Sequence, residues 1–324
     1  MLISVALFAV GLVLLIKGGD WFVDGATGIA KRFRLPDIVV GATVVSIGTT
    51  LPEVMVSTTG ALQGSGAMAY GNAIGSIICN TALIAAISIV VNPGPVNVKS
   101  MKTPALFFFL SAGLYCLAAY GLGTFPRWMG FVMLAIFVAY TVLTVRNGMK
   151  NPDAEAEEEE EESKPKALWQ ELLLLVIGAA VIAVGADLLV DHGQIIAIEL
   201  GVPETVVALL FVALGTSLPE LVTTITSLKK GRASLGVGNV IGANVFNLVL
   251  VSGVAVSLAP FDVPVENTLL NTGLNLSLVF DIPVMLGVMS LMIFPALLGK
   301  KLSRWQGIAL LGIYAAFCVC QFVL

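Results

Sequence analysis

The feature that most constrains this chain is a duplication that places one acidic residue inside each of two apolar stretches. Residues 46–53 (Ser-Ile-Gly-Thr-Thr-Leu-Pro-Glu) return as residues 213–220 (Ala-Leu-Gly-Thr-Ser-Leu-Pro-Glu), and the two copies end in Glu53 and Glu220. Residues 71–80 return as residues 238–247 at the same offset of 167 positions. An ionisable residue at membrane depth is costly and indicates a functional site. Two of them at matched positions are hard to explain by packing.

The composition identifies the class of protein. The 324 residues are 57% hydrophobic and 12% charged, with a mean hydropathy of +0.97. A soluble globular domain has about 25% charged residues, so we expect a polytopic membrane protein. The length leaves room for about ten spans of roughly 20 residues. Lys17 is the first basic residue and follows the apolar N-terminal run, which favours a retained helix over a cleaved signal peptide.

The predicted fold is an all-α membrane protein with ten transmembrane helices in two inverted five-helix repeats. The repeats occupy residues 1–147 and 168–324, and an acidic linker over 148–167 separates them. The expected spans are residues 2–30, 37–62, 68–91, 103–121, 127–147, 168–198, 203–229, 233–259, 275–298 and 304–323. The linker's run of like charges, residues 157–162, is expected to be a solvated tether, with calcium sensing as the alternative.

Lysine and arginine positions predict the orientation. With the N-terminus outside, Arg127 is the only basic residue in the outer loops, and all the other loop lysines and arginines lie inside. Both termini are therefore expected outside a cell (inner) membrane, with the linker in the cytoplasm. Because each repeat has an odd number of helices, the second enters from the opposite side. Inverted repeats are a common architecture of secondary transporters, whose sites lie near the midplane.

The repeated signatures supply oxygen ligands. Pro52 lacks a backbone N–H and interrupts its helix, and the carbonyls freed there survive only inside protein or along a cavity. Thr49 and Thr50 add hydroxyls beside Glu53, and Thr216 and Ser217 do so beside Glu220. Asn80 and Asn247 end the second signature and offer amide oxygens, although an interhelical hydrogen bond is the alternative reading of each.

This inventory favours hard cations such as Ca²⁺ and Na⁺ over zinc or copper. The four cysteines show no zinc-like spacing with His192, the only histidine, and we expect no resident cofactor. Two facing carboxylates balance one Ca²⁺, two Na⁺ or two protons. An empty site would leave buried charges uncompensated, so only the loaded protein is expected to switch between the two sides, which is antiport.

The paired signatures resemble the alpha repeats of the cation/calcium exchanger superfamily, in particular its prokaryotic sodium/calcium exchanger branch. The resemblance implies ten helices in two inverted fives, a central diamond of cation sites, and first and sixth helices that slide as a gate. It implies that Glu53 and Glu220 bind both ions and that Thr49 and Thr216 contribute carbonyls. The sodium and middle positions would be completed by Ser76, Asn80, Ser217, Asn247 and the carbonyls of Ser46 and Ala213.

Two positions depart from the family pattern. Ala243 stands where several relatives carry a serine matching Ser76, which puts one sodium site in question. Asn247 stands where some relatives, including potassium-dependent ones, have aspartate. The neutral amide argues against potassium dependence and leaves two acidic groups in the core.

The predicted function is therefore Ca²⁺/Na⁺ antiport, with Ca²⁺/H⁺ antiport as the runner-up. A passive cation channel is a third reading, which predicts calcium flux without a counter-gradient. An intramembrane hydrolase is disfavoured because the chain has no Gly-x-Ser-x-Gly nucleophile motif. The expected partners are inorganic cations and the lipid bilayer. No nucleic acid is expected, and no protein partner can be deduced from the sequence.

Overall fold

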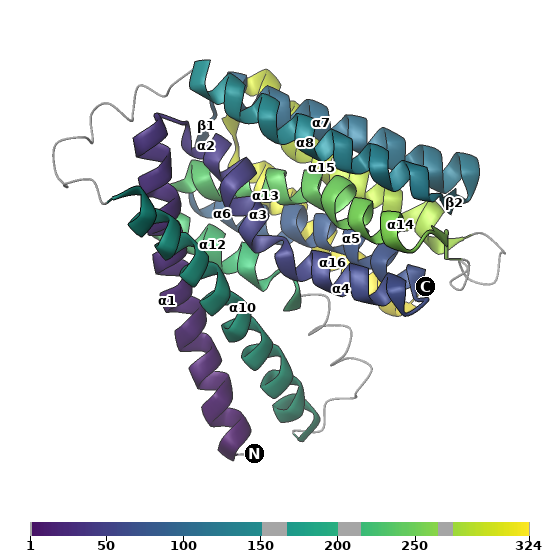
Figure 1. The fold of residues 1–324 in the computed structure, drawn as a ribbon, viewed down its shortest axis with the longest axis horizontal. Helices are drawn as coiled ribbons and strands as arrows, with labels where there is room; N and C mark the ends of the chain where they lie inside the picture. Colours follow the sequence, from purple (N-terminus) through teal and green to yellow (C-terminus); the bar gives the residue numbers. More distant parts are fainter. Residues whose placement is uncertain (1, 151–166, 200–214, 265–274, 324) are drawn as a thin grey trace.

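The computed structural model describes residues 2–150, 167–199, 215–264 and 275–323, and almost all of these residues are helical (Figure 1). Residues 2–150 form α1 (Leu2–Phe33), α2 (Asp37–Val40), the π-helical turn η1 (Gly41–Val45), α3 (Ser46–Thr49), α4 (Leu51–Leu62), α5 (Gly66–Cys79), η2 (Asn80–Ala85), α6 (Ala86–Val91), α7 (Val98–Cys116), η3 (Leu117–Leu122) and α8 (Arg127–Lys150).

The remaining described residues form α10 (Leu168–Glu199), α12 (Leu218–Lys229), α13 (Ala233–Phe246), η4 (Asn247–Val251), α14 (Ser252–Leu258), η6 (Ser277–Asp281), α15 (Ile282–Gly299) and α16 (Arg304–Val323). Four two-residue strands complete the set: β1 (Gly94–Pro95), β2 (Thr124–Phe125), β3 (Phe261–Asp262) and β4 (Lys301–Leu302).

The helices are those of a polytopic membrane protein. Among the described residues, seven helices are long and apolar enough to cross a membrane, or eight if the bent pair Asp37–Thr49 and Leu51–Leu62 is one span. These eight coincide with eight of the ten expected spans. Of the other two, the expected span 203–229 lies partly outside the described residues, and 304–323 corresponds to α16. The number of ten spans stays a prediction.

The sequence duplication extends to the folded elements. Helices α4 and α12, helices α5 and α13, and strands β1 and β3 each have the same length and lie 167 positions apart. In both halves a π-helical turn follows the matched helix and begins at an asparagine, Asn80 or Asn247. The same local sequence therefore gives the same local structure twice.

The matched helices α1 and α10 lie side by side and antiparallel, and they extend away from the other helices (Figure 1). A Cβ atom on Gly11 would lie 2.9 Å from the carbonyl oxygen of Gly185, and a Cβ on Gly185 would lie 2.9 Å from that of Gly11. A Cβ on Gly18 would lie 3.1 Å from the carbonyl oxygen of Gly178, and a Cβ on Gly178 would lie 2.5 Å from the backbone nitrogen of Phe22. These four residues, which we call the glycine seam, let the two backbones touch because glycine has no side chain.

The short strands join the two halves of the chain. Strand β1 pairs antiparallel with β4, and β2 pairs antiparallel with β3. Each pair thus takes one strand from residues 1–150 and one from the second half of the chain. Phe125 of β2 is fully buried and packs against Phe261 of β3, with ring centroids 5.2 Å apart.

The start of the fourth expected span was wrong by about one helical turn. Helix α7 begins at Val98 and not at residue 103, because the side chain of Asn97 accepts hydrogen bonds from the backbone N–H groups of Lys99 (3.1 Å) and Ser100 (3.2 Å). An asparagine in this position caps a helix by pairing two of its unbonded N–H groups. Lys99 and Lys102, expected in a loop, lie in the first turns of this helix.

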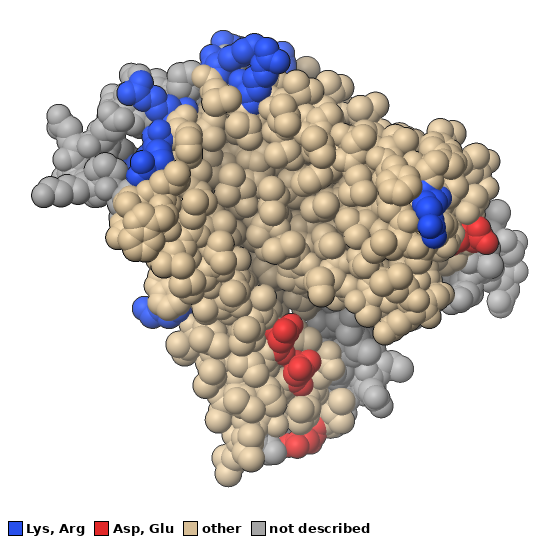
Figure 2. All heavy atoms as spheres, viewed as in Figure 1, with Lys and Arg blue, Asp and Glu red and all other residues tan. Residues whose placement is uncertain are grey.

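Basic side chains gather at one end of the molecule. On the face drawn in Figure 2, lysine and arginine lie mainly around the last turns of α1 and α8, while acidic side chains lie along the far half of α10 and near β3. An uneven distribution of this kind fits the orientation expected from the loops. The orientation in a membrane stays a prediction.

Candidate cation-binding site

The first glutamate signature folds into an interrupted helix, and the described part of the second has the same backbone conformation at the matched position. Helix α3 ends at Thr49, α4 begins at Leu51, and the axes on either side differ by 46°. Thr50 between them has φ −84° and ψ −4°, and Ser217 at the matched position before α12 has φ −92° and ψ 4°. This sparsely populated backbone region is where many active-site residues lie. The predicted interruption of the 37–62 helix is confirmed.

Each proline sits in the first turn of the helix that follows the break, where its missing N–H costs nothing. Glu53 and Glu220 follow directly and occupy the first turns of α4 and α12. The N-terminal end of a helix carries partial positive charge and favours a carboxylate there. The break thus positions both carboxylates and helps to hold their charge.

The two carboxylates lie near each other in the interior. Both residues are fully buried, and their side chains are close enough to interact electrostatically. Within the described residues, all four carboxylate oxygens of Glu53 and Glu220 lack a hydrogen-bond partner. The hydroxyls of Thr49 and Thr50 lie near the Glu220 carboxylate, but neither is placed to complete a hydrogen bond with it. A buried charge left in this way is strongly destabilising unless a cation or proton compensates it.

The asparagines of the second signature also point amides into the interior without partners. Asn80 and Asn247 are fully buried, and both polar atoms of each side chain lack a hydrogen-bond partner among the described residues. Asn80 begins η2, which contacts the helix of Glu220, and Asn247 begins η4, which contacts the helix of Glu53. Each asparagine therefore begins a turn that packs against the glutamate helix of the other half. Isolated π-helical turns are frequent at functional sites.

One smaller predicted residue, Ser217, lies in the same region. Ser217 is buried, and its hydroxyl has no partner among the described residues. Cys79, which precedes Asn80, lies near both Ser217 and Glu220, so these side chains share one neighbourhood. Ser76 is buried one turn earlier on α5. Native interiors rarely leave so many polar atoms unpaired, and the group indicates a site for a ligand rich in positive charge.

Other predicted residues direct their hydroxyls at protein acceptors. The Ser46 hydroxyl donates to the carbonyl of Gly41 (2.7 Å), and the Thr49 hydroxyl donates to Oδ1 of Asn239 (3.1 Å). The partly exposed Thr216 donates to Oδ1 of Asn72 (3.4 Å). Ala213 lies outside the described residues. The roles of the predicted residues as cation ligands stay predictions.

The two asparagines that receive these hydroxyls were not predicted from the sequence. Asn72 and Asn239 are 167 positions apart, and each accepts from a threonine of the other half. Their repetition beside Gly71 and Gly238 was the available signal. In the described chain, no group of three or more His, Cys, Asp or Glu side chains comes together. The donors of this region are therefore mainly carboxylate, hydroxyl and amide groups. Such donors suit hard cations.

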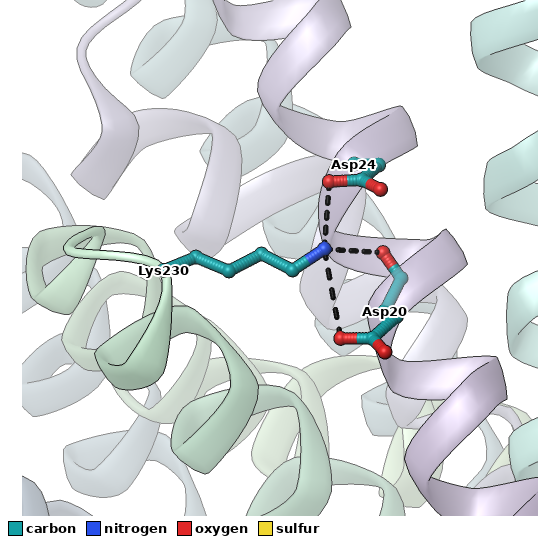
Figure 3. A network of polar contacts seen from close by, with 3 residues as sticks. All are labelled: Asp20, Asp24 and Lys230. Carbon is teal, nitrogen blue, oxygen red and sulfur yellow. Dashed lines mark hydrogen bonds and ion pairs between the residues drawn. The ribbon is translucent and has the colours of Figure 1, made fainter.

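Away from this region, one lysine connects α1 to the end of α12 (Figure 3). Nζ of Lys230 lies 2.7 Å from Oδ1 of Asp24 and 3.6 Å from Oδ1 of Asp20, and it donates to the Asp20 carbonyl at 3.0 Å. The position that matches Lys230 in the other half is Gln63, which carries no charge. The matched position therefore cannot form the same ion pairs.

Comparison with known proteins gives concordant results. The sequence profile described as sodium/calcium exchanger protein matches residues 3–146 and 171–323. An uncharacterised membrane protein of Methanocaldococcus jannaschii is 34% identical over 314 residues, which cover 97% of this chain and 96% of that protein. The sodium/calcium exchanger MaX1 of Methanosarcina acetivorans is 29% identical over 355 residues, with 99% of each chain covered.

A solved structure shares the fold over nearly its whole length. The sodium–calcium exchanger NCX_Mj, soaked with zero Na⁺ and Ca²⁺, superimposes with a TM-score of 0.80 and 31% sequence identity, covering 99% of both chains. A likeness of this extent covers both copies of the duplicated signature.

Proposed function

This chain belongs to the sodium/calcium exchanger family, in its prokaryotic cation/calcium exchanger branch, and we propose that it is a secondary active antiporter that exchanges Ca²⁺ for Na⁺ by alternating access. The family consists of transporters and not of catalytic enzymes. Its substrates are inorganic cations, and the chain is an integral membrane protein. The choice of Na⁺ as counter-ion and the alternating-access mechanism are the proposal.

The observation that carries the proposal is the pair of buried carboxylates without protein partners. Glu53 and Glu220 lie close together and fully inside the protein. Removing one partner from a buried ion pair costs about 3–5 kcal/mol, so an empty, doubly ionised site is strongly disfavoured. If the protein must pass through an occluded state to change sides, it does so with cations bound. Each crossing then carries one set of ions, and net flux requires exchange.

The proposed ligands follow from the buried oxygens. Glu53 and Glu220 bind both Ca²⁺ and Na⁺, and the backbone carbonyls of Thr49 and Thr216 complete the calcium position. Thr50, Ser76, Asn80, Ser217, Asn247 and the carbonyls of Ser46 and Ala213 serve the sodium and middle positions. The unpaired amides of Asn80 and Asn247 and the unpaired hydroxyls of Thr50 and Ser217 support this assignment within the described residues.

The proposed architecture is ten helices in two inverted repeats, residues 1–147 and 168–324, with both termini outside the cell membrane. The antiparallel packing of the matched helices α1 and α10 supports the inversion. The exchange of partners between the halves, in which each threonine bonds the other half's asparagine, supports it as well. In such an arrangement the cation site lies near the membrane midplane, where the repeats meet.

One observation favours a second candidate, Ca²⁺/H⁺ antiport. Ala243 is fully buried at the position that matches Ser76, so the second half supplies no hydroxyl there. A weaker sodium site would leave protons as the ions that neutralise Glu53 and Glu220 on the return step.

Flux into reconstituted vesicles tests both candidates. Purified protein in vesicles preloaded with Na⁺ is expected to accumulate radioactive Ca²⁺ when the outside lacks Na⁺, and an equivalent proton gradient is expected to drive little uptake. Uptake driven by the proton gradient alone would replace the sodium proposal with the proton one. Calcium entry without either gradient would indicate a channel and remove the antiport proposal.

A further inference from the structure

Two asparagines outside the proposed ligand set form matched bonds between the halves of the chain. Asn239 of α13 accepts the Thr49 hydroxyl at 3.1 Å, and Asn72 of α5 accepts the Thr216 hydroxyl at 3.4 Å. Each threonine precedes a buried glutamate of its own half by four positions. The same contact occurs twice at positions related by the duplication, which makes an accidental origin of either contact improbable.

The orientation of the Asn72 amide follows from its surroundings. Its Nδ2 donates to the Ser57 hydroxyl at 2.8 Å and approaches the Glu53 carbonyl, an acceptor only, at 3.4 Å. Its Oδ1 must therefore face Thr216. Amide orientations are assigned from partners of this kind. In Asn239, Oδ1 likewise faces the Thr49 hydroxyl, and Nδ2 has no hydrogen-bond partner among the described residues.

The hydroxyl of Thr49 has three acceptors within its neighbourhood. Oδ1 of Asn239 lies at 3.1 Å and the Ser46 carbonyl at 3.5 Å, and the Glu220 carboxylate lies near Thr49 but has no completed hydrogen bond in the described chain. A hydroxyl has one hydrogen, so a bond to the amide withholds that hydrogen from the carboxylate. The neighbouring Ser46 hydroxyl lies 3.2 Å from the same Oδ1, but its two shorter contacts are with the backbone carbonyls of Gly41 (2.7 Å) and Asn239 (2.9 Å).

We propose that Asn239 is a positioning residue that sets calcium affinity by holding the Thr49 hydroxyl away from the Glu220 carboxylate, and that Asn72 does the same for Thr216 and the first half. The Glu220 carboxylate then has no hydrogen bond from Thr49 that a cation would have to displace. Because the hydroxyl hydrogen points at the amide, the lone pairs of the hydroxyl oxygen point away from the amide. This inference rests on the proposed function, since it concerns the same cations and the same two glutamates.

Replacing Asn239 with leucine removes the acceptor and keeps a similar volume. The Thr49 hydroxyl is then expected to donate to Glu220, giving the carboxylate an internal partner that a cation has to displace. A hydrogen bond to a charged group corresponds to about a tenfold change in affinity or more. We therefore expect Asn239→Leu to raise the calcium KM about tenfold with a smaller change in maximal flux.

A double-mutant cycle separates this mechanism from a packing effect. In a Thr49→Val background no hydroxyl is present, so Asn239→Leu is expected to change the calcium KM by less than about twofold. A matched control is Asn244→Leu, which also removes a buried amide from α13 but one whose partners are Thr81 (2.7 Å) and Met289. If the tenfold effect persists without the Thr49 hydroxyl, or if the control reproduces it, the proposal is overturned.

Equilibrium binding of Ca²⁺ to the purified protein distinguishes this inference from the function on which it rests. Wild-type protein that neither binds nor transports Ca²⁺ would remove the proposed function, and the inference with it. Wild-type binding together with an unchanged affinity in Asn239→Leu would remove the inference alone. If Asn239→Leu does not insert, Asn239→Ala carries out the same comparison with a smaller side chain.

Discussion

The side chains of Glu53 and Glu220 interact electrostatically across the two halves of the chain, and neither makes a hydrogen bond within the described residues. The duplication brings them together from helices that begin at matched prolines. Their proximity concentrates negative charge at one buried point, which is the property that a divalent cation recognises.

Neutralising either carboxylate is expected to abolish transport. Glu53→Gln or Glu220→Gln leaves one buried charge where the cations require two, and a loss of about 3–5 kcal/mol in cation binding corresponds to at least about 100-fold less calcium flux. Flux in vesicles measures the loss, and size-exclusion elution reports whether the protein remains folded. Glu171→Gln is the control, because this buried carboxylate already pairs with Arg32 at 3.0 Å. Near-normal flux in either site variant would exclude that residue from the mechanism.

Restoring the missing hydroxyl is expected to strengthen sodium dependence. Ala243→Ser adds one oxygen ligand at the position that matches Ser76, and we expect the sodium concentration for half-maximal exchange to fall by roughly threefold, the effect of a modest polar contact. The measurement is calcium flux at varied internal Na⁺. Ala255→Ser, at another fully buried alanine, controls for adding a hydroxyl to the interior. An unchanged sodium dependence would exclude position 243 from the sodium site.

The ion pairs of Lys230 with Asp20 and Asp24 are expected to contribute modestly to stability. The lysine is 29% exposed and the two aspartates are 42% and 48% exposed, so solvent screens the pairs and each contributes about 0.2–1 kcal/mol at most. Lys230→Gln should lower the free energy of unfolding by that amount, and high salt should reduce the difference from wild type. Lys229→Gln removes the neighbouring charge and serves as the control. A loss that is insensitive to salt would contradict this account.

Substitution in the glycine seam is expected to force α1 and α10 apart. A Cβ on Gly18 would lie 2.9 Å from the backbone nitrogen of Ile182, which cannot move without its helix. Gly18→Ala should therefore lower the free energy of unfolding by about 1–3 kcal/mol, the typical cost of overpacking. Gly113→Ala, where a Cβ meets no atom within 4 Å, should be neutral or slightly stabilising. Equal effects of the two substitutions on thermal unfolding would contradict the close approach.

Local structure and the repeated elements could be predicted from the sequence, whereas hydrogen bonds between distant segments could not. The break at Pro52 follows from a missing N–H, and the matched elements follow from matched residues. The start of α7 was also encoded, in the capping side chain of Asn97, but hydropathy alone placed it later. The bond from Thr49 to Asn239 joins residues 190 positions apart. It depends on how α3 packs against α13, which no local pattern specifies.

The strand pairs impose an order on biogenesis. Strand β1 (Gly94–Pro95) is synthesised early, whereas its partner β4 (Lys301–Leu302) is synthesised about 200 residues later. Strand β1 therefore has no partner strand until then. A ribosome that stalls before that point leaves the early half inserted with an unpaired edge. The β1–β4 pair thus forms only after Leu302 has been synthesised, and truncations before Lys301 are expected to leave β1 without its partner strand even though the residues around Glu53 are intact.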